Sequence, residues 1–174
     1  MDEVLSLESR RKIYEFVVMN PGTYLREMER SLDMQPGLLS YHLDHLESKQ
    51  LLRIEDDGYR KRYFASTDFR LKDRRTISLL RLESPRRILM HLLVNGSTPF
   101  KDLQESVGVS KSTLSYNLKK LTKAGIVLVE RNEREMIYRV EDRDEVADIL
   151  VVLQGSLQND AVDRFVDIWR KLSR

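Results

Sequence analysis

The sequence predicts a mainly α fold with small β-wings (α+β), built from two copies of one compact unit and a C-terminal helical segment. Three observations carry this prediction. The chain repeats itself at an offset of 75 residues, apolar residues recur at helical spacing through most of each copy, and this spacing changes to strict alternation near the end of each copy. At 174 residues, the chain lies between the lengths typical of one domain and of two.

The internal repeat aligns residues 7–65 with residues 82–140 without a gap, and 15 of the 59 paired positions are identical. Within it, LLSYHLDHL falls on TLSYNLKKL. A unit of about 60 residues is longer than a solenoid repeat, so two small domains are expected. The predicted boundaries are a first domain at 1–66, an ordered connector at 67–81, a second domain at 82–141 and a helical segment at 142–174.

Each copy begins with two amphipathic helices. Ser9 and Ser84 are the predicted N-caps of the first helix, which ends at an Asn-Pro-Gly stretch in one copy and an Asn-Gly pair in the other. Thr23 and Thr98 are the predicted caps of the shorter second helix. A tight turn follows, in which Gly108 suits a left-handed conformation.

The third helix of each copy leads into two short strands. Its predicted N-caps are Gln35, followed by Pro36 in the first turn, and Ser110. After it, LLRIE and RKRYFA in the first copy, and IVLVE and MIYRVE in the second, have the alternation of paired strands. Three helices followed by a β-hairpin are the element order of a winged helix-turn-helix.

The connector and the tail are both predicted to be ordered. The connector contains neither Gly nor Pro and is expected to be short and helical. The tail has two apolar stripes, divided near Gly155 and Asn159-Asp160, as in two helices. Its apolar face either covers the chain's own domains or pairs with a second copy in a homodimer, and Trp169 suits both locations.

Composition argues against several classes of protein. The chain has no Cys, so it forms neither disulfides nor thiolate metal sites. No apolar stretch reaches 18 residues and no signal-peptide pattern opens the chain, so we expect a soluble cytoplasmic protein without a membrane partner. No nucleophile elbow, phosphate-binding loop or carboxylate pair is recognisable, and we expect neither an enzyme nor a cofactor.

The net charge is only +2, but its distribution is uneven. Lys and Arg outnumber Asp and Glu by five to two in the connector and by ten to seven in the second copy, whereas both ends of the chain are slightly acidic. In the second copy, four lysines and no acid lie between positions 110 and 129. Cations hold phosphates and hydroxyl groups hydrogen-bond to base edges, so this helix is suited to DNA.

The segment GVSKSTLSYNLKKLTKAGIVLVE, with the later YRV, resembles the recognition helix and wing of winged-helix transcription regulators of the ArsR/MarR-like type. The segment NPGTYLREMERSLDMQPGLLSYHLDHLESKQLLRIEDDGYRKRYF is similar to the units of archaeal regulators with two tandem winged helices. The resemblance covers residues 7–140. It implies a sequence-specific regulator of transcription that binds double-stranded DNA through two winged helices.

The resemblance also implies which positions face DNA. In the second copy, the base-facing positions are Ser110, Lys111, Ser112, Ser115, Tyr116 and Lys119, and the wing positions are Arg131 and Arg134. In the first copy, they are Gln35, Gly37, Ser40, Tyr41 and Asp44, with a wing of Arg60, Lys61 and Arg62. The residue pattern itself adds Lys120 and Lys123 to the second helix as phosphate-binding cations, and His42 to the first as a base-reading side chain.

The first copy departs from this pattern, because Asp44 and Glu47 stand where the second copy has Lys119 and Thr122. Phosphate repels carboxylates, so two hypotheses are open. In one, the helix reads bases while its wing holds phosphates; in the other, this unit contacts a protein. The second hypothesis keeps an alternative function open, that of an accessory factor for chromosome segregation or transcription initiation with weak or no DNA binding.

His42 and His45 lie three residues apart, which is a spacing that two metal ligands on a helix can have. No third ligand is evident in the sequence, because the only other histidine is His91 and Cys is absent. We therefore expect one histidine to pack in the helix interface, the other to lie at the surface, and no metal to bind.

Overall fold

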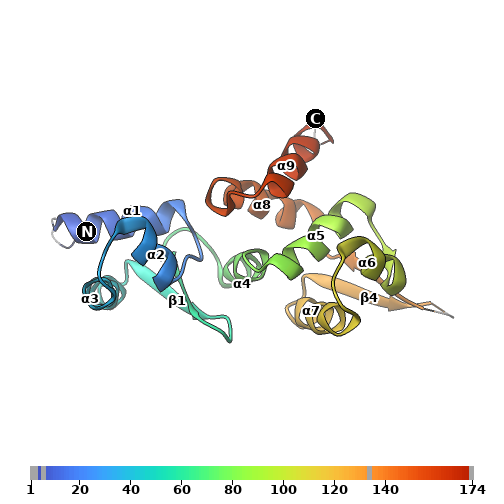
Figure 1. Cartoon of the computed structure of the whole chain (residues 1–174), viewed down its shortest axis with the longest axis horizontal. Coiled ribbons are helices and arrows are strands. Elements are labelled where there is room, and N and C mark those ends of the chain that lie inside the picture. The colour runs from blue at the N-terminus through green and yellow to red at the C-terminus, as the bar shows by residue number, and fades with distance from the viewer. Residues whose placement is uncertain (1–3, 5–6, 133–134, 173–174) are drawn as a thin grey trace. The chain divides into compact units, whose positions relative to one another are not determined.

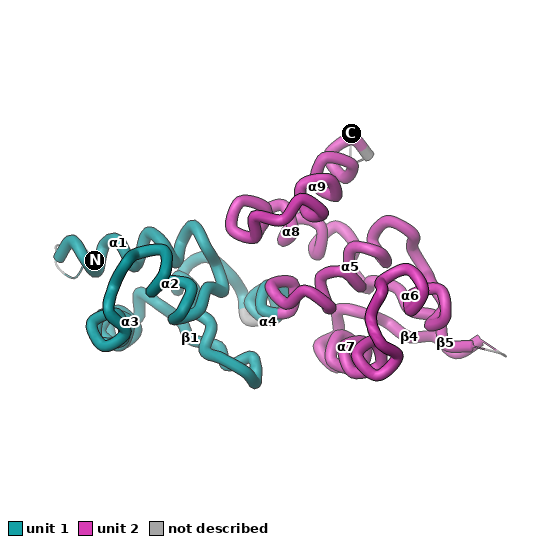
Figure 2. The backbone as a smooth tube through the Cα atoms, viewed as in Figure 1, with its two compact units in different colours: residues 1–78 teal, residues 79–174 magenta. Residues whose placement is uncertain are grey.

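The computed structural model describes residues 4, 7–132 and 135–172. The chain divides into two compact units, residues 1–78 and 79–174 (Figure 2). Helices make up most of each unit, and the strands of each form a small antiparallel sheet (Figure 1). The predicted fold class, mainly α with small β-wings, is confirmed.

The first unit consists of three helices and a β-hairpin, in the predicted order. Its elements are α1 (Glu8–Met19), α2 (Leu25–Leu32), α3 (Pro36–Ser48), β1 (Leu52–Asp56) and β2 (Lys61–Ala65). The hairpin pairs Leu52 with Ala65 and Asp56 with Lys61. Its core consists of the buried residues Ile13, Val17, Met28, Leu39, Leu43, Leu46, Leu52 and Tyr63.

The second unit repeats this plan and adds a short third strand. Its elements are α5 (Glu83–Asn95), β3 (Thr98–Pro99), α6 (Phe100–Val107), α7 (Lys111–Lys123), β4 (Val127–Arg131) and β5 (Met136–Val140). Strand β5 lies between β3 and β4. The apolar face of α7 is fully buried through Leu114, Leu118 and Leu121.

The turn between the second and third helices has one backbone conformation in both units. Asp33 has a φ of 51° and its repeat partner Gly108 a φ of 67°, so both are left-handed. Glycine adopts this region without strain and aspartate is among the few other residues that visit it. The predicted left-handed turn residue at position 108 is confirmed, and the repeat extends to backbone geometry.

The first helix of each unit begins two residues earlier than predicted. Ser9 and Ser84 are not N-caps but lie in the first turn, because α1 starts at Glu8 and α5 starts at Glu83. A glutamate in the first turn interacts favourably with the positive end of the helix dipole. Since the cap positions fall on leucines, these helix starts are not stabilised by a side-chain cap.

Thr23 and Thr98 were also wrongly predicted as caps, because both join the sheet. Thr23 bridges to Tyr63, and Thr98 pairs with Tyr138 as part of β3. β-branched threonine suits an extended backbone, and pairing beside a tyrosine stabilises it further. The hydroxyl of Thr23 still donates to the Glu27 carboxylate at 2.8 Å, so it continues to stabilise the start of α2.

Helix α4 (Leu71–Leu80) occupies most of the connector, and the division between the units falls inside it. In the first unit, Arg74 Nε forms an ion pair with Glu55 Oε1 at 2.9 Å. In the second unit, the buried Arg86 donates from Nη1 to the Leu80 carbonyl at 2.9 Å. The helix is thus bonded at one end to β1 and at the other to α5.

The tail forms α8 (Arg143–Leu157) and α9 (Asp160–Leu172), and the two helices pack together. Gly155 lies inside α8, and the break falls at Gln158 and Asn159. The Asn159 side chain caps α9 by accepting from the backbone N–H of Val162 at 3.2 Å. Val162, Phe165 and Val166 are buried inside the second unit. Much of the tail's apolar face therefore covers its own unit, and the homodimer stays a prediction.

Candidate nucleic-acid interface

The recognition helix of the second unit, α7, begins at a well-formed cap. Ser110 occupies the N-cap position, as predicted, and its Oγ accepts from the backbone N–H of Thr113 at 3.1 Å. The same hydroxyl lies 3.0 Å from the Oγ of Ser112. These bonds order the first turn of α7, from which HTH proteins contact base edges.

The outward face of α7 is polar and rich in lysine. Tyr116 is 55% exposed. Lys111, Lys119 and Lys123 are exposed, and none of the three forms an ion pair with any described residue. The predicted residues that the structure places on this exposed face are Ser110, Lys111, Ser112, Ser115, Tyr116, Lys119 and Lys123, with Lys120 half-buried beside them. Such a face offers cations for phosphates and hydroxyl groups for bases.

Of the two cations predicted for the wing of the second unit, one lies within the described residues. Arg131 ends β4 and is exposed, whereas Arg134 lies outside the described residues. Arg139, on β5, is paired with Glu130 at 3.1 Å, so its charge is already balanced. Among the residues of this unit predicted to contact DNA, the exposed cations that the structure describes are Lys111, Lys119 and Lys123 on α7 and Arg131 on β4.

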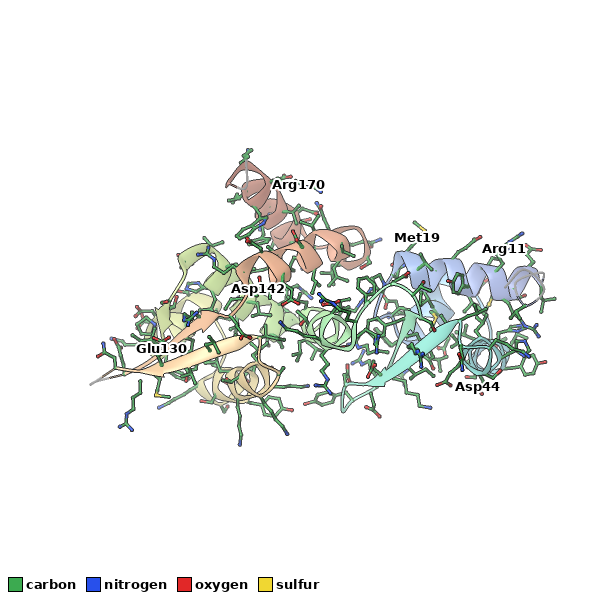
Figure 3. All side chains as sticks on the ribbon, turned by 180° about the vertical axis from the view of Figure 1, so that it is seen from behind. Arg11, Met19, Asp44, Glu130, Asp142 and Arg170 are labelled. Atoms are coloured by element: carbon green, nitrogen blue, oxygen red, sulfur yellow. The ribbon has the colours of Figure 1, made fainter. Side chains whose placement is uncertain are left out.

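The corresponding helix of the first unit, α3, presents a different face. Gln35 is its N-cap, as predicted, and Pro36 occupies the first turn. Tyr41 is 60% exposed, Gln35 and Gly37 are exposed, and Ser40 is half-buried. Asp44 projects from this helix beside them (Figure 3). Among the predicted base-facing residues of α3, only neutral and acidic side chains thus lie at the surface.

His42 is not available to read a base, and its prediction as a DNA contact is wrong. The side chain is only 3% exposed and packs edge-on against Tyr41, with ring centroids 5.2 Å apart. Its Nδ1 is buried and has no hydrogen-bond partner within the described residues. Burial, with the nearby charges of Arg10 and His45, lowers the pKa of His42 below its ordinary value. The helix register explains this, since His42 shares the inward face with Leu39 and Leu43.

Arg62 is likewise a structural residue and not a free cation of the wing. Its side chain is 2% exposed; Nε pairs with Asp57 Oδ2 at 2.8 Å and Nη1 donates to the Gly22 carbonyl at 3.0 Å. Burial alone would raise the pKa of Asp57, but the bond from Arg62 and those from the Tyr59 and Arg60 amides together lower it. The predicted contact of Arg62 with phosphate is corrected to an internal ion pair.

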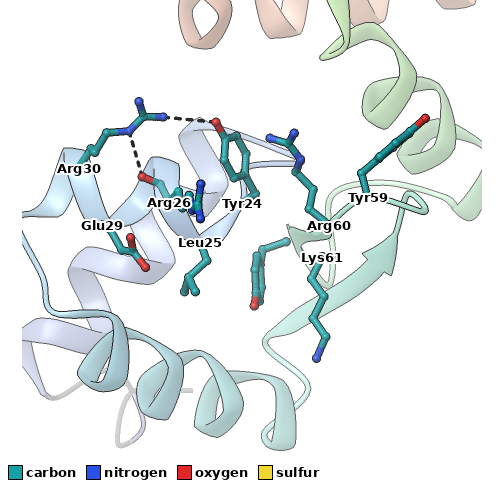
Figure 4. A pocket seen from close by; sticks show the side chains of 9 residues that line it. Tyr24, Leu25, Arg26, Glu29, Arg30, Tyr59, Arg60 and Lys61 are labelled. Carbon is teal, nitrogen blue, oxygen red and sulfur yellow. Dashed lines mark hydrogen bonds between the residues drawn. The ribbon is translucent and has the colours of Figure 1, made fainter.

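The other two cations of the first wing border a groove that sequence reasoning missed. The groove, of about 840 Å³, lies between α2 and the wing (Figure 4). Arg60 and Lys61 line it from the wing, and Arg26 and Arg30 line it from α2. A signal for this groove is present in the sequence, because Arg30 and Arg60 of the first copy align with Glu105 and Glu135 of the second. In helix-turn-helix proteins the recognition helix is the customary base contact, so sequence pattern alone does not point to α2.

No metal centre accompanies these surfaces. Within the described ranges, no group of three or more His, Asp or Glu side chains is placed to hold a metal ion. His42 is buried, as expected for a histidine that packs in the helix interface, and His45 is half-buried. No helix in the described part of the chain is long and apolar enough to cross a bilayer.

The two units together define the class: the chain is a tandem helix-turn-helix protein with a β-wing in each unit. A family model described as an N-terminal HTH domain matches residues 7–77. A second, described as winged helix-turn-helix DNA-binding, matches residues 81–127. The prediction of two such domains in tandem is confirmed.

Individual relatives agree with these matches. The chain is 28% identical over 142 residues to an HTH-type transcriptional regulator of Methanocaldococcus jannaschii, covering 81% of this chain and 35% of that protein. It is 33% identical over 66 residues to the HTH-type transcriptional regulator NmtR of Mycobacterium tuberculosis, covering 37% and 55%. It thus spans little more than a third of the first and about half of the second. The transcriptional repressor BigR of Xylella fastidiosa is similar in structure, with a TM-score of 0.41, 23% identity, and coverage of 45% and 80%.

We expect the His42→Asn variant to make the first unit less sensitive to acid. The pKa of His42 is lower in the folded state than in the unfolded chain, so its contribution to stability is complete above about pH 6.5 and is lost as the pH falls. In the second unit Asn117 holds the equivalent position and donates to the Thr113 carbonyl at 2.8 Å. Urea unfolding at pH 7.5 and 5.5, followed by circular dichroism, measures the difference.

In this measurement Trp169 is an internal reference. It is the only tryptophan and lies on α9, so its fluorescence reports on the second unit. The pKa of His45 is also lowered, so the first unit of the variant retains part of its acid sensitivity. The pKa of His91 is lowered in the second unit, so that unit has an acid sensitivity of its own, which Trp169 reports. A variant that loses as much stability between the two pH values as the native protein would contradict the prediction.

Proposed function

We propose that this protein is a transcription regulator that binds double-stranded DNA, with α7 of the second unit as its main electrostatic contact. The observation that carries the proposal is the outward face of α7. Three exposed lysines there have no ion-pair partner among the described residues, and they flank the hydroxyl groups of Ser115 and Tyr116. The names of the two relatives found by sequence, both HTH-type transcriptional regulators, support the same function.

The finer part of the proposal is sequence-specific recognition by both units. In the second unit, Ser110, Ser112, Ser115 and Tyr116 would read base edges while the lysines and Arg131 hold phosphates. In the first unit, Gln35, Gly37, Ser40 and Tyr41 would face the bases. A homodimer through residues 142–174 would place two such chains on a pseudo-palindromic site.

A second candidate is a tandem winged-helix accessory factor that contacts protein. The exposed carboxylates of Asp44 and Glu47 on α3 favour it, because they oppose the approach of phosphate. Under this alternative, the first unit docks on a protein and DNA binding by the chain is weak or absent.

The test is the affinity for a random-sequence duplex of about 30 base pairs, measured by fluorescence anisotropy at several salt concentrations. A DNA-binding regulator is expected to lose affinity steeply with salt, by about 0.9 in logarithmic slope for each phosphate contacted. Selection of bound fragments from genomic DNA then supplies the specific site and its symmetry. No binding at 50 mM salt would exclude the proposal and favour the accessory factor.

A further inference from the structure

The exposed face of the third helix is acidic in the first unit and basic in the second. On a second surface, between the second helix and the wing, the positive charge lies on the first unit instead. That second surface is the α2–wing groove of the first unit, lined by Tyr24, Leu25, Arg26, Glu29, Arg30, Tyr59, Arg60, Lys61 and Tyr63. Four cations and one carboxylate line it. The third helix of the same unit exposes Asp44 and Glu47. The positive charge of the first unit is therefore displaced from the recognition helix to the groove.

Tyr24 holds two of the four cations in place. The guanidinium carbon of Arg60 lies 4.4 Å from the centroid of the Tyr24 ring, which is within the range of a cation–π contact. The Tyr24 hydroxyl accepts from Arg30 Nη2 at 3.3 Å, and Arg30 Nε donates to the Arg26 carbonyl at 3.1 Å. Figure 4 shows Tyr24 between Arg30, on α2, and Arg60, on the wing. These two guanidinium groups are thus positioned in advance of any ligand.

The charges of the groove are not balanced from within. Arg26, Arg30, Arg60 and Lys61 are all exposed, and none forms an ion pair with a carboxylate among the residues that the structure describes. Arg62 and Arg74, in the same unit, are both paired. Four cations against the single carboxylate of Glu29 leave the groove with a net positive charge. Such a groove suits a polyanion, and a phosphodiester backbone supplies a row of negative charges.

The second unit lacks this groove chemistry at the same repeat positions. Pro99, Glu105, Glu135 and Met136 replace Tyr24, Arg30, Arg60 and Lys61. The one retained cation, Lys101 in place of Arg26, lies 4.0 Å from Glu105 on the same helix. The repeat position of the lining residue Tyr59 is Arg134, which lies outside the described residues. At the four cation positions of the groove the second unit keeps one cation, so the shared fold does not dictate this charge pattern.

We infer that the first unit holds the phosphate backbone of nucleic acid in its α2–wing groove, through Arg26, Arg30, Arg60 and Lys61, instead of through its recognition helix. The inference rests on the proposed function. It states that both units bind the same DNA duplex, each through a different surface. The second unit binds duplex DNA through α7. The first unit binds duplex phosphates through the groove, while the acids of α3 keep that helix from contributing non-specific affinity.

The experiment compares the Arg30→Ala/Lys61→Ala double variant with the native chain in binding a 30-base-pair duplex at several salt concentrations. Loss of two phosphate contacts is expected to lower the logarithmic salt slope by about 2 and the affinity roughly tenfold at 100 mM salt. The matched control is Arg11→Ala/Lys12→Ala, which removes the same charge from α1 of the same unit (Figure 3) and is expected to bind like the native chain.

Two further arms identify the source of the phosphate. The single strand of the same sequence and inorganic phosphate at constant ionic strength are offered as competitors. If the double variant binds duplex with native affinity and slope, the inference is overturned. It is equally overturned if the variant loses affinity only for the single strand, or if it loses only the thermal stabilisation that inorganic phosphate gives the native chain. In either case the groove binds a ligand other than duplex DNA.

The fold of the variant and the proposed function are checked separately. Arg30 bonds to Tyr24, so Lys61→Ala alone, with an expected slope change of about 1, tests the groove even if the double variant unfolds. Lys111→Ala/Lys119→Ala tests α7. If only the α7 variant weakens binding, the proposed function stands and the groove assignment fails. If neither variant has an effect, the proposed function fails as well.

Discussion

The Lys111→Ala/Lys119→Ala variant is expected to bind duplex DNA 10- to 100-fold more weakly than the native chain at about 100 mM salt. Both lysines are exposed on α7 and form no ion pair with the residues described. Their charge is therefore available to replace counterions on phosphates. The salt slope should fall by about 2, and the loss should be similar for every sequence, because phosphate contacts carry no base information.

The control for this variant removes two cations from the same unit at a different place. Arg164→Ala/Arg170→Ala changes the charge of α9 by the same amount, and both side chains are exposed. We expect its affinity to stay within about twofold of the native value, because distant charges are screened over a Debye length of about 10 Å. Equal losses in the two variants would mean that net charge, and not the face of α7, controls binding.

The Arg62→Ala variant is expected to destabilise the first unit by about 3 to 5 kcal/mol, because it leaves the Asp57 carboxylate buried without its partner. The two side chains are 2% and 4% exposed, so solvent cannot replace the lost ion pair. The Gly22 carbonyl loses a hydrogen bond as well. Urea unfolding by circular dichroism, with hydrogen exchange of the β1–β2 peptides, measures the change, while Trp169 fluorescence monitors the second unit.

The second unit itself suggests the companion variant. Asn132 and Ile137 occupy the repeat positions of Asp57 and Arg62. Asp57→Asn/Arg62→Ile should therefore be more stable than Arg62→Ala, because neither change leaves a buried charge and isoleucine fills the space apolarly. A double variant as unstable as Arg62→Ala would show that the bonds of Arg62 to the backbone, and not the buried charge, dominate.

Helix α7 shows which features can be predicted from the sequence. The outward face of α7 follows from helical spacing alone, because Leu114, Leu118 and Leu121 direct the intervening polar residues to solvent. The cap at Ser110 and the left-handed residue at Gly108 follow from local preferences of the backbone. The gapless repeat carries the left-handed turn from Gly108 to Asp33, whereas Gln35, at the repeat position of Ser110, makes no side-chain cap bond.

The first unit shows where such reasoning fails. The Arg-Lys-Arg triplet of its wing looks uniform in sequence, yet Arg60 and Lys61 are exposed while Arg62 is buried. Strand alternation places one of them inward, but whether a buried arginine is tolerated depends on Asp57 and on the Gly22 carbonyl, 40 residues away. The prediction for His42 fails for a related reason: its polarity suggests exposure, whereas its position between Leu39 and Leu43 places it on the buried face of the helix.

Two helix-turn-helix units, their element order and the lysine face of α7 can thus be predicted from the chain alone, because each depends on contacts between residues close in sequence. The groove of the first unit cannot, because its walls come from α2 and from a wing about 30 residues later. Only folding brings Arg30 and Arg60 to either side of Tyr24. The burial of Arg62 and His42 is likewise decided by packing between distant segments, on which local pattern carries no information.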